Sequence, residues 1–178
     1  ILSSIGYLDS GHVIEVDRSQ MVSPYQGETP KLVDRLCDKA QGGILFVDEA
    51  YTLAPINSTG ERDHQGAQAL EKLMKRMEDD RGKFVVVVAG YRIEMDNLFR
   101  VNPGFRSRFN YFLNIEDYSP EELFSIMKIF ASDKKYIFSD EAVVLTKKII
   151  TELYDNRDSD FANGRTVRSL FDKICKKQ

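Results

Sequence analysis

Two adjacent acids, Asp48 and Glu49, follow the short apolar run Ile44-Leu-Phe-Val47. The run predicts a buried strand, and its carboxyl end belongs to the edge at which open α/β sheets bind ligands. Successive residues on a strand point to opposite faces, so the two acids could perform different tasks. One carboxylate could hold a magnesium ion, while the other polarises an attacking water. A strand that simply ends in two solvated acids explains the motif equally well on its own.

Arginines that could meet a phosphate occur in two further segments. Arg106 and Arg108 lie within 102–109, and a guanidinium at a subunit edge can stabilise charge on a neighbour's γ-phosphate. Taken alone, this pair is more simply read as solvated surface arginines. Arg165 and Arg168 lie at the start of the last expected helix. A helix N-terminus favours anions, so a bound phosphate is the favoured partner for Arg165.

One aromatic residue, in Tyr25-Gln26-Gly27, stands on a glycine-containing loop before an expected helix. Without further context, we favour a tyrosine ring packed on the core.

Strands and helices alternate through the first part of the chain, which predicts a parallel α/β sheet with right-handed crossovers. Thr29 is expected to cap a helix with Pro30 at its first position, and Gly42-Gly43 to end it. The apolar run 84–89 predicts a strand covered on both faces. The expected elements are strands at 12–17, 44–47, 84–89 and, more weakly, 111–115, with helices from Thr29 and over 63–80.

The pattern changes after Asp117, where only helices are expected. Ser119-Pro-Glu-Glu122 is a capping box that opens a helix to about Asp133. Further helices are expected from Ser139 to about Tyr154 and over 166–177. We therefore predict an α/β core over residues 1–118 and a small helical domain over 119–178.

Composition limits the partners and the compartment. The 178 residues are 42% hydrophobic and 30% charged, with a net charge of −3 and interspersed basic residues. This balance does not indicate a nucleic-acid groove, and no apolar run approaches the roughly 20 residues of a membrane helix. Cys37 and Cys175 have neither metal nor disulfide spacing, which favours free thiols in the cytoplasm or another reducing soluble compartment. The first residue is Ile1 rather than Met, so we expect a cut or processed piece.

Several segments together, in order and spacing, resemble the AAA+ family of P-loop ATPases. The resemblance is closest to the CbbX-like branch, which includes the red-type Rubisco activases and the sporulation protein SpoVK. It spans nearly the whole chain and is carried by residues 15–18, 25–29, 43–53, 60–63, 87–91, 102–109 and 161–165.

The resemblance implies ATP and Mg²⁺ as cofactors and assigns roles to individual residues. Asp48 corresponds to the Walker B magnesium residue and Glu49 to the catalytic base. Arg108 corresponds to the arginine finger, with Arg106 as a substitute or a second contact in trans. Arg92 is the nearest candidate for the polar sensor-1 residue.

The same resemblance assigns residues in the lid and in the central channel of a ring. Arg165 occupies the sensor-2 position, with Arg168 as a possible substitute. Tyr25, Gln26 and Gly27 correspond to the pore loop that grips a polypeptide, which reverses the interpretation of Tyr25 as a core residue.

The chain departs from the family in one respect: Gly-x-x-x-x-Gly-Lys-[Ser/Thr] does not occur in it. Gly82-Lys83 is the only Gly-Lys pair, and Phe84 follows it. Backbone amides of that loop cradle the phosphates, so we expect an N-terminally truncated core that is a poor ATPase by itself. The missing strand would lie between the strands at 84–89 and 111–115, leaving two unpaired edges.

The full-length protein is therefore expected to hydrolyse ATP in a homo-oligomeric ring, a hexamer, and to remodel or thread a protein client. The alternative is a non-catalytic AAA+-like module that regulates an active partner. The intact Asp48, Glu49 and Arg108 argue against that alternative.

Overall fold

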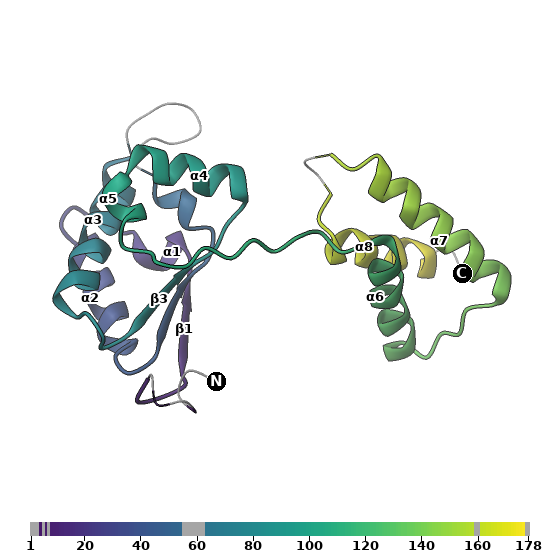
Figure 1. The fold of residues 1–178 in the computed structure, drawn as a ribbon, viewed down its shortest axis with the longest axis horizontal. Coiled ribbons are helices and arrows are strands. Elements are labelled where there is room, and N and C mark those ends of the chain that lie inside the picture. Colours follow the sequence, from purple (N-terminus) through teal and green to yellow (C-terminus); the bar gives the residue numbers. More distant parts are fainter. Residues whose placement is uncertain (1–3, 5, 7, 55–62, 159–160, 177–178) are drawn as a thin grey trace. The chain divides into compact units, whose positions relative to one another are not determined.

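The structure, a computed structural model, describes residues 4, 6, 8–54, 63–158 and 161–176. The chain forms two compact units, Ile1–Leu113 and Asn114–Gln178 (Figure 1). Each unit has an apolar core of its own. No helix in the described ranges is long and apolar enough to cross a membrane.

The first unit contains a three-stranded parallel sheet in the order β1-β2-β3. Its strands are β1 (Val13–Val16), β2 (Ile44–Val47) and β3 (Val85–Val88). Val47 pairs with Val16 on one side and with Val88 on the other, so the three carboxyl ends are level. The expected parallel α/β core is confirmed.

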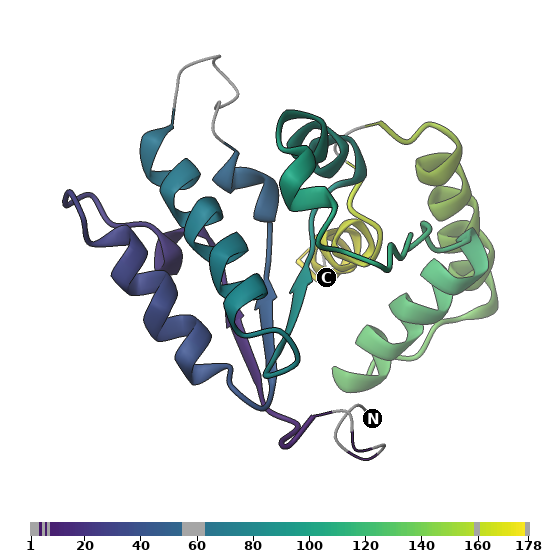
Figure 2. The same cartoon turned by 60° about the vertical axis from the view of Figure 1, so that its left-hand side comes forward.

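Helices connect the strands and supply most of the apolar core. The two longest, α2 (Thr29–Lys39) and α3 (His64–Asp79), lie side by side next to the sheet (Figure 2). Their buried faces meet the inward residues of β2 through side chains such as Val33, Leu70 and Leu73. The shorter helices are α1 (Arg18–Met21), η1 (Ala50–Leu53), α4 (Arg92–Val101) and α5 (Pro103–Arg106).

Thr29 does not cap α2, contrary to expectation. The N-cap is Glu28, and Thr29 is the first helical residue with Pro30 after it. The Thr29 hydroxyl is buried and accepts a hydrogen bond from the Ser23 amide at 3.0 Å. The hydroxyl thus fixes the preceding loop at Ser23 and does not accept a hydrogen bond from an amide of the helix N-terminus.

Two expectations about the other side of the sheet are wrong. Val87 of β3 is 37% exposed, so this strand is not covered on both faces. The segment 111–115 forms no strand, and Tyr111, Leu113 and Ile115 are exposed. A strand needs a hydrogen-bonded neighbour, and β3 pairs only with β2 in the part of the chain that the structure describes.

The second unit is a bundle of α6 (Pro120–Asp133), α7 (Asp140–Asp155) and α8 (Gly164–Cys175). The capping box of Ser119 and Glu122 is present, as expected. The helix α8 begins two residues before the predicted Thr166. Its N-cap, Asn163, bonds the Asp117 carboxylate at 2.7 Å and the Tyr118 amide at 3.0 Å.

Candidate functional site

The two acids lie at the carboxyl edge of the sheet, directly after the central strand. The Asp48 amide donates to the Val16 carbonyl of β1 at 2.8 Å, and the Ala50 amide donates to Ala89, after β3, at 3.0 Å. These bonds hold the turn between the ends of the outer strands. Both Asp48 and Glu49 are exposed there, so their carboxylates are open to a ligand.

The backbone turns sharply at Glu49, which has left-handed angles of φ 47° and ψ 43°. The Asp48 carboxylate accepts a hydrogen bond from the Glu49 amide at 3.0 Å. The Glu49 carbonyl accepts from the Thr52 amide and hydroxyl at 2.9 and 2.7 Å. The two acids are therefore not successive strand residues, as the sequence had suggested, because the strand ends at Val47 and the turn separates them.

Tyr51 belongs to this turn, although its sequence position gave no functional signal beyond lying next to the acids. Its ring lies 6.2 Å from that of Tyr91, and a β-carbon at Gly90 would be 2.7 Å from it. Burial raises the pKa of Tyr51, and the neighbouring charge of Glu49 raises it further. The phenol therefore remains a neutral hydrogen-bond donor beside Glu49 at neutral pH.

The two arginines of the 102–109 segment differ in their surroundings. Arg108 is half-buried, and its Nε and Nη1 atoms donate to the carbonyls of Met74 at 3.2 Å and Gly104 at 2.7 Å. Arg106 is exposed, with its guanidinium carbon 4.5 Å from the centre of the Phe112 ring. The Arg108 guanidinium is thus oriented by carbonyls of its own chain, and that of Arg106 lies over the Phe112 ring.

The other predicted arginines lie on the helices α4 and α8. Arg92 is exposed at the first position of α4, three residues beyond Ala89. Arg165 is exposed in the first turn of α8, and Arg168, one turn later, stacks 5.0 Å from the Phe130 ring. Arg165 and Arg168 belong to the second unit.

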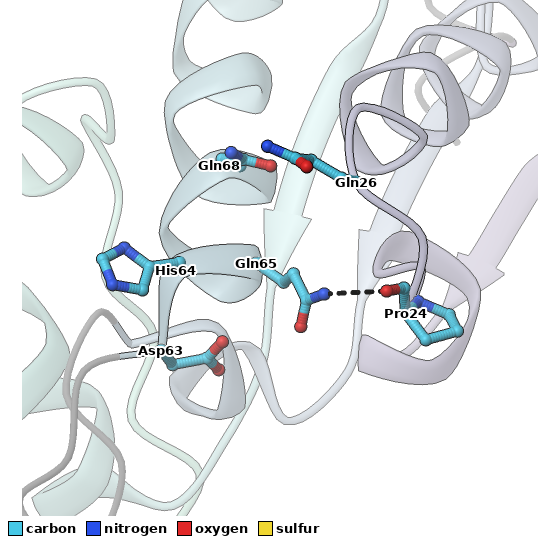
Figure 3. A pocket seen from close by; sticks show the side chains of 6 residues that line it. All are labelled: Pro24, Gln26, Asp63, His64, Gln65 and Gln68. Atoms are coloured by element: carbon cyan, nitrogen blue, oxygen red, sulfur yellow. Dashed lines mark hydrogen bonds between the residues drawn. The ribbon is translucent and has the colours of Figure 1, made fainter.

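Tyr25 is 74% exposed, so its ring does not pack on the core. Gly27 has φ +80°, an angle that glycine adopts readily, and it allows the loop to turn back into α2. The side-chain amide of Gln65, on α3, donates to the Pro24 carbonyl at 3.3 Å. An open cavity of about 530 Å³ lies beside this loop, lined by Pro24, Gln26, Asp63, His64, Gln65 and Gln68 (Figure 3).

The turn that carries Asp48 and Glu49, called the acid turn below, suits a magnesium ion that arrives with a nucleotide. Among the described residues no three ligating side chains converge. Mg²⁺ commonly uses only one or two protein carboxylates and completes its shell with phosphate and water. An exposed Asp48 at the carboxyl edge of the sheet matches that donor requirement.

Comparison with known proteins extends over the whole chain. Residues 3–117 match the family model described as ATPase family associated with various cellular activities (AAA), and residues 119–178 match the AAA lid domain. Protein CfxQ of Xanthobacter flavus is 39% identical over all of this chain and 55% of its own length.

Two further relatives have comparable identity. The chloroplastic ribulose bisphosphate carboxylase/oxygenase activase of Cyanidioschyzon merolae is 38% identical over all of this chain and 59% of its own. Stage V sporulation protein K of Bacillus subtilis is 38% identical over 96% of this chain and 52% of its own. The chain thus spans little more than half the length of these relatives.

Proposed function

The chain belongs to the AAA family of ATPases, and from this premise we propose that its parent protein is an ATP-driven ring that remodels or threads a polypeptide. The observation that carries the proposal is the acid turn. Two exposed carboxylates follow a buried central strand, at the sheet edge where this class of fold binds its ligands.

We assign the two acids different tasks. Asp48, whose carboxylate is oriented by the Glu49 amide, holds the magnesium ion. Glu49 is displaced from the strand by its left-handed backbone and accepts the proton of the attacking water. Bound Mg²⁺ would supply positive charge to the phosphates.

The remaining roles belong to the other predicted arginines and to the loop of Tyr25. Arg108, with Arg106 as its substitute or as a second contact, stabilises charge in a neighbour's site. Arg165 of the lid contacts the phosphates, and Arg168 is the alternative residue for this role. A polar group at the end of β3 is expected to sense the γ-phosphate, and Arg92 remains the candidate. The exposed Tyr25, with Gln26 and Gly27, faces the channel of a six-membered ring and contacts the client.

The test uses the full-length gene product with Glu49→Gln. Loss of the general base should lower kcat for ATP about 100-fold or more while Mg²⁺-ATP binding remains. Asp48→Asn is the matched variant, and it should weaken Mg²⁺-dependent binding itself. Equal turnover by wild type and Glu49→Gln would contradict the assignment of Glu49.

The alternative is a non-catalytic AAA-like module that regulates an active partner. It predicts that the full-length protein binds a partner ATPase but has no turnover of its own. The exposed, separately oriented acids favour the enzyme, because a regulatory surface has no need of them.

A further inference from the structure

Arg18 connects two parts of the first unit that are distant in sequence. It is the first residue of α1, and only the N-cap Asp17 separates it from the end of β1. Its Nη1 atom donates to the Thr52 carbonyl at 2.7 Å and lies 2.5 Å from the Asp63 carboxylate. One guanidinium nitrogen therefore joins the end of η1 to the start of α3.

On one side, this contact leads to the acid turn. Thr52 donates both its amide and its hydroxyl to the Glu49 carbonyl, so the position of Thr52 depends on the backbone of Glu49. A change in the Glu49 turn would thus move the carbonyl that Arg18 binds.

On the other side, the contact leads to the loop of Tyr25. The Asp63 carboxylate caps α3 by accepting from the Gly66 amide at 2.9 Å. From the same turn of α3, Gln65 donates to the Pro24 carbonyl, next to Tyr25 (Figure 3). The loop of Tyr25 is therefore hydrogen-bonded to α3, and Arg18 contacts the N-cap of the same helix.

Glycine at position 66 provides a second, independent sign that this arrangement is specific. A β-carbon there would lie 2.8 Å from Arg18 Nη1 and 2.7 Å from an Asp63 carboxylate oxygen. Glycine inside a helix is unfavourable, but here it leaves space for the guanidinium. Burial opposes ionisation of Asp63, yet hydrogen bonds from Arg18 and Gly66 outweigh it and lower the pKa of this carboxyl.

We propose that Arg18 is a positioning residue that couples the Glu49 turn to the Tyr25 loop, so that the nucleotide state alters the loop. The proposal rests on the proposed function, because it needs a nucleotide at the acid turn. The contacts form a continuous path between two proposed sites, and the coupling it predicts is measurable.

The experiment measures amide hydrogen exchange of residues 22–28 in the full-length protein with ATP and with ADP, together with the affinity for each. In the wild type, exchange should differ between the two nucleotides. Arg18→Gln and Gly66→Ala should reduce that difference about threefold to tenfold with unchanged affinity. Arg18→Lys keeps a charged donor for Asp63 and should restore part of it.

Glu28→Gln is the matched control, because it breaks the exposed Lys31–Glu28 pair near the same loop. It should leave the nucleotide dependence intact. Wild-type exchange differences in Arg18→Gln and Gly66→Ala would overturn the coupling and leave the proposed function standing. Parallel loss of affinity and thermal stability would assign Arg18 to stability alone and also overturn it. A wild type that binds no nucleotide would overturn the proposed function, and this inference with it.

Discussion

At Glu49 the backbone adopts a conformation that costs a non-glycine residue roughly 1–2 kcal/mol. The surrounding bonds hold it there: Asp48 accepts from its amide, and Thr52 donates twice to its carbonyl. Such outliers concentrate at functional sites, where the strain places a side chain that a relaxed backbone would not. The angle thus supports the catalytic assignment independently of the acid motif.

The contrast between Arg108 and Arg106 leads to a prediction in which stability and activity separate. Arg108→Ala removes the hydrogen bonds of Arg108 to the Met74 and Gly104 carbonyls and should cost about 1–2 kcal/mol of unfolding free energy. Arg106→Ala removes the exposed cation–π contact with Phe112, worth about 0.5–1 kcal/mol. Urea unfolding of this chain measures both.

The activity of the same variants tests the trans role. In the full-length protein, Arg108→Ala should lower kcat by about 1,000-fold or more. Mixing it with Glu49→Gln subunits should restore some turnover, because each subunit supplies what its neighbour lacks. No recovery on mixing would indicate that Arg108 acts within its own subunit.

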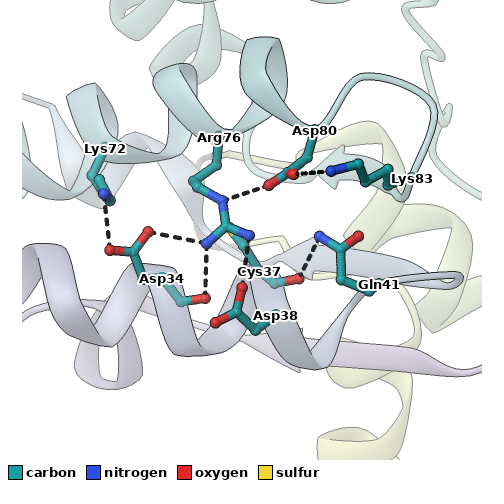
Figure 4. A network of polar contacts seen from close by, with 8 residues as sticks. All are labelled: Asp34, Cys37, Asp38, Gln41, Lys72, Arg76, Asp80 and Lys83. Carbon is teal, nitrogen blue, oxygen red and sulfur yellow. Dashed lines mark hydrogen bonds and ion pairs between the residues drawn. The ribbon is translucent and has the colours of Figure 1, made fainter.

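Between the helices α2 and α3, a cluster of charges surrounds one arginine (Figure 4). Arg76 contacts Asp34 at 3.0 Å, Asp38 at 2.7 Å and Asp80 at 2.6 Å, with its own side chain only 14% exposed. Beneath it, burial raises the pKa of the Cys37 thiol to about 11. This cysteine is therefore an unreactive core residue, and the cluster fixes the register of the two helices.

Removing Arg76 should destabilise the first unit by about 2 kcal/mol, because three carboxylates lose a largely buried partner. The matched control Lys31→Met breaks the exposed pair with Glu28 and should cost less than about 0.5 kcal/mol. Chemical unfolding of Arg76→Met and Lys31→Met at pH 7 compares them. Equal effects would mean that the cluster adds no more than a surface pair.

The sign of the pH dependence follows from the carboxylates. Burial opposes ionisation of Asp34, but hydrogen bonds from Lys72 and Arg76 lower its pKa, and bonds from Lys83 and Arg76 lower that of Asp80. Their stabilisation is complete above the unfolded pKa of about 3.9 and is lost as pH falls through the lower folded values. Arg76→Met should therefore be less acid-sensitive below about pH 4 than the wild type.

The sequence predicted those elements whose signals are local. The strand Ile44–Val47 and the capping box at Ser119 were predicted because an apolar run and a capping pattern each lie within a few neighbouring residues. The segment 111–115 has the residue types of a strand but no partner strand, and pairing depends on residues remote in the chain. The role of Thr29 was also mispredicted, because its hydroxyl accepts a hydrogen bond from the Ser23 amide and does not cap the helix.

The candidate site was predicted as residue types more fully than as geometry. The position of Asp48 and Glu49 at the sheet edge follows from one strand, so it could be predicted. The left-handed turn at Glu49 and the carbonyls that orient Arg108 depend on tertiary contacts, which no local pattern contains. Arg18 was missed for the same reason: its partners, Thr52 and Asp63, are more than 30 residues away in sequence.

At the scale of the whole molecule, the two units have separate cores, so they should unfold separately. Met127 is fully buried in the second core and Leu70 in the first. Each substitution to alanine should cost its own unit about 2–4 kcal/mol. Calorimetry of this chain should show Met127→Ala lowering one transition and Leu70→Ala the other. A single unfolding transition whose midpoint is lowered equally by both substitutions would indicate one cooperative unit.

Nucleotide binding by these 178 residues alone should be weak. Asp48 and Glu49 can serve metal and water, but the sequence contains no Gly-x-x-x-x-Gly-Lys-[Ser/Thr] loop to donate amides to the phosphates. Each charge-assisted hydrogen bond is worth about 1.5–3 kcal/mol, so losing two weakens binding by more than about 100-fold. Titration of a fluorescent ATP analogue should therefore show far weaker binding by these 178 residues than by the full-length protein. The exposed edge at Val87 favours self-association, so light scattering should first establish that the titrated chain is monomeric. Micromolar binding by the monomer would contradict the prediction and assign the phosphate contacts to residues already present here.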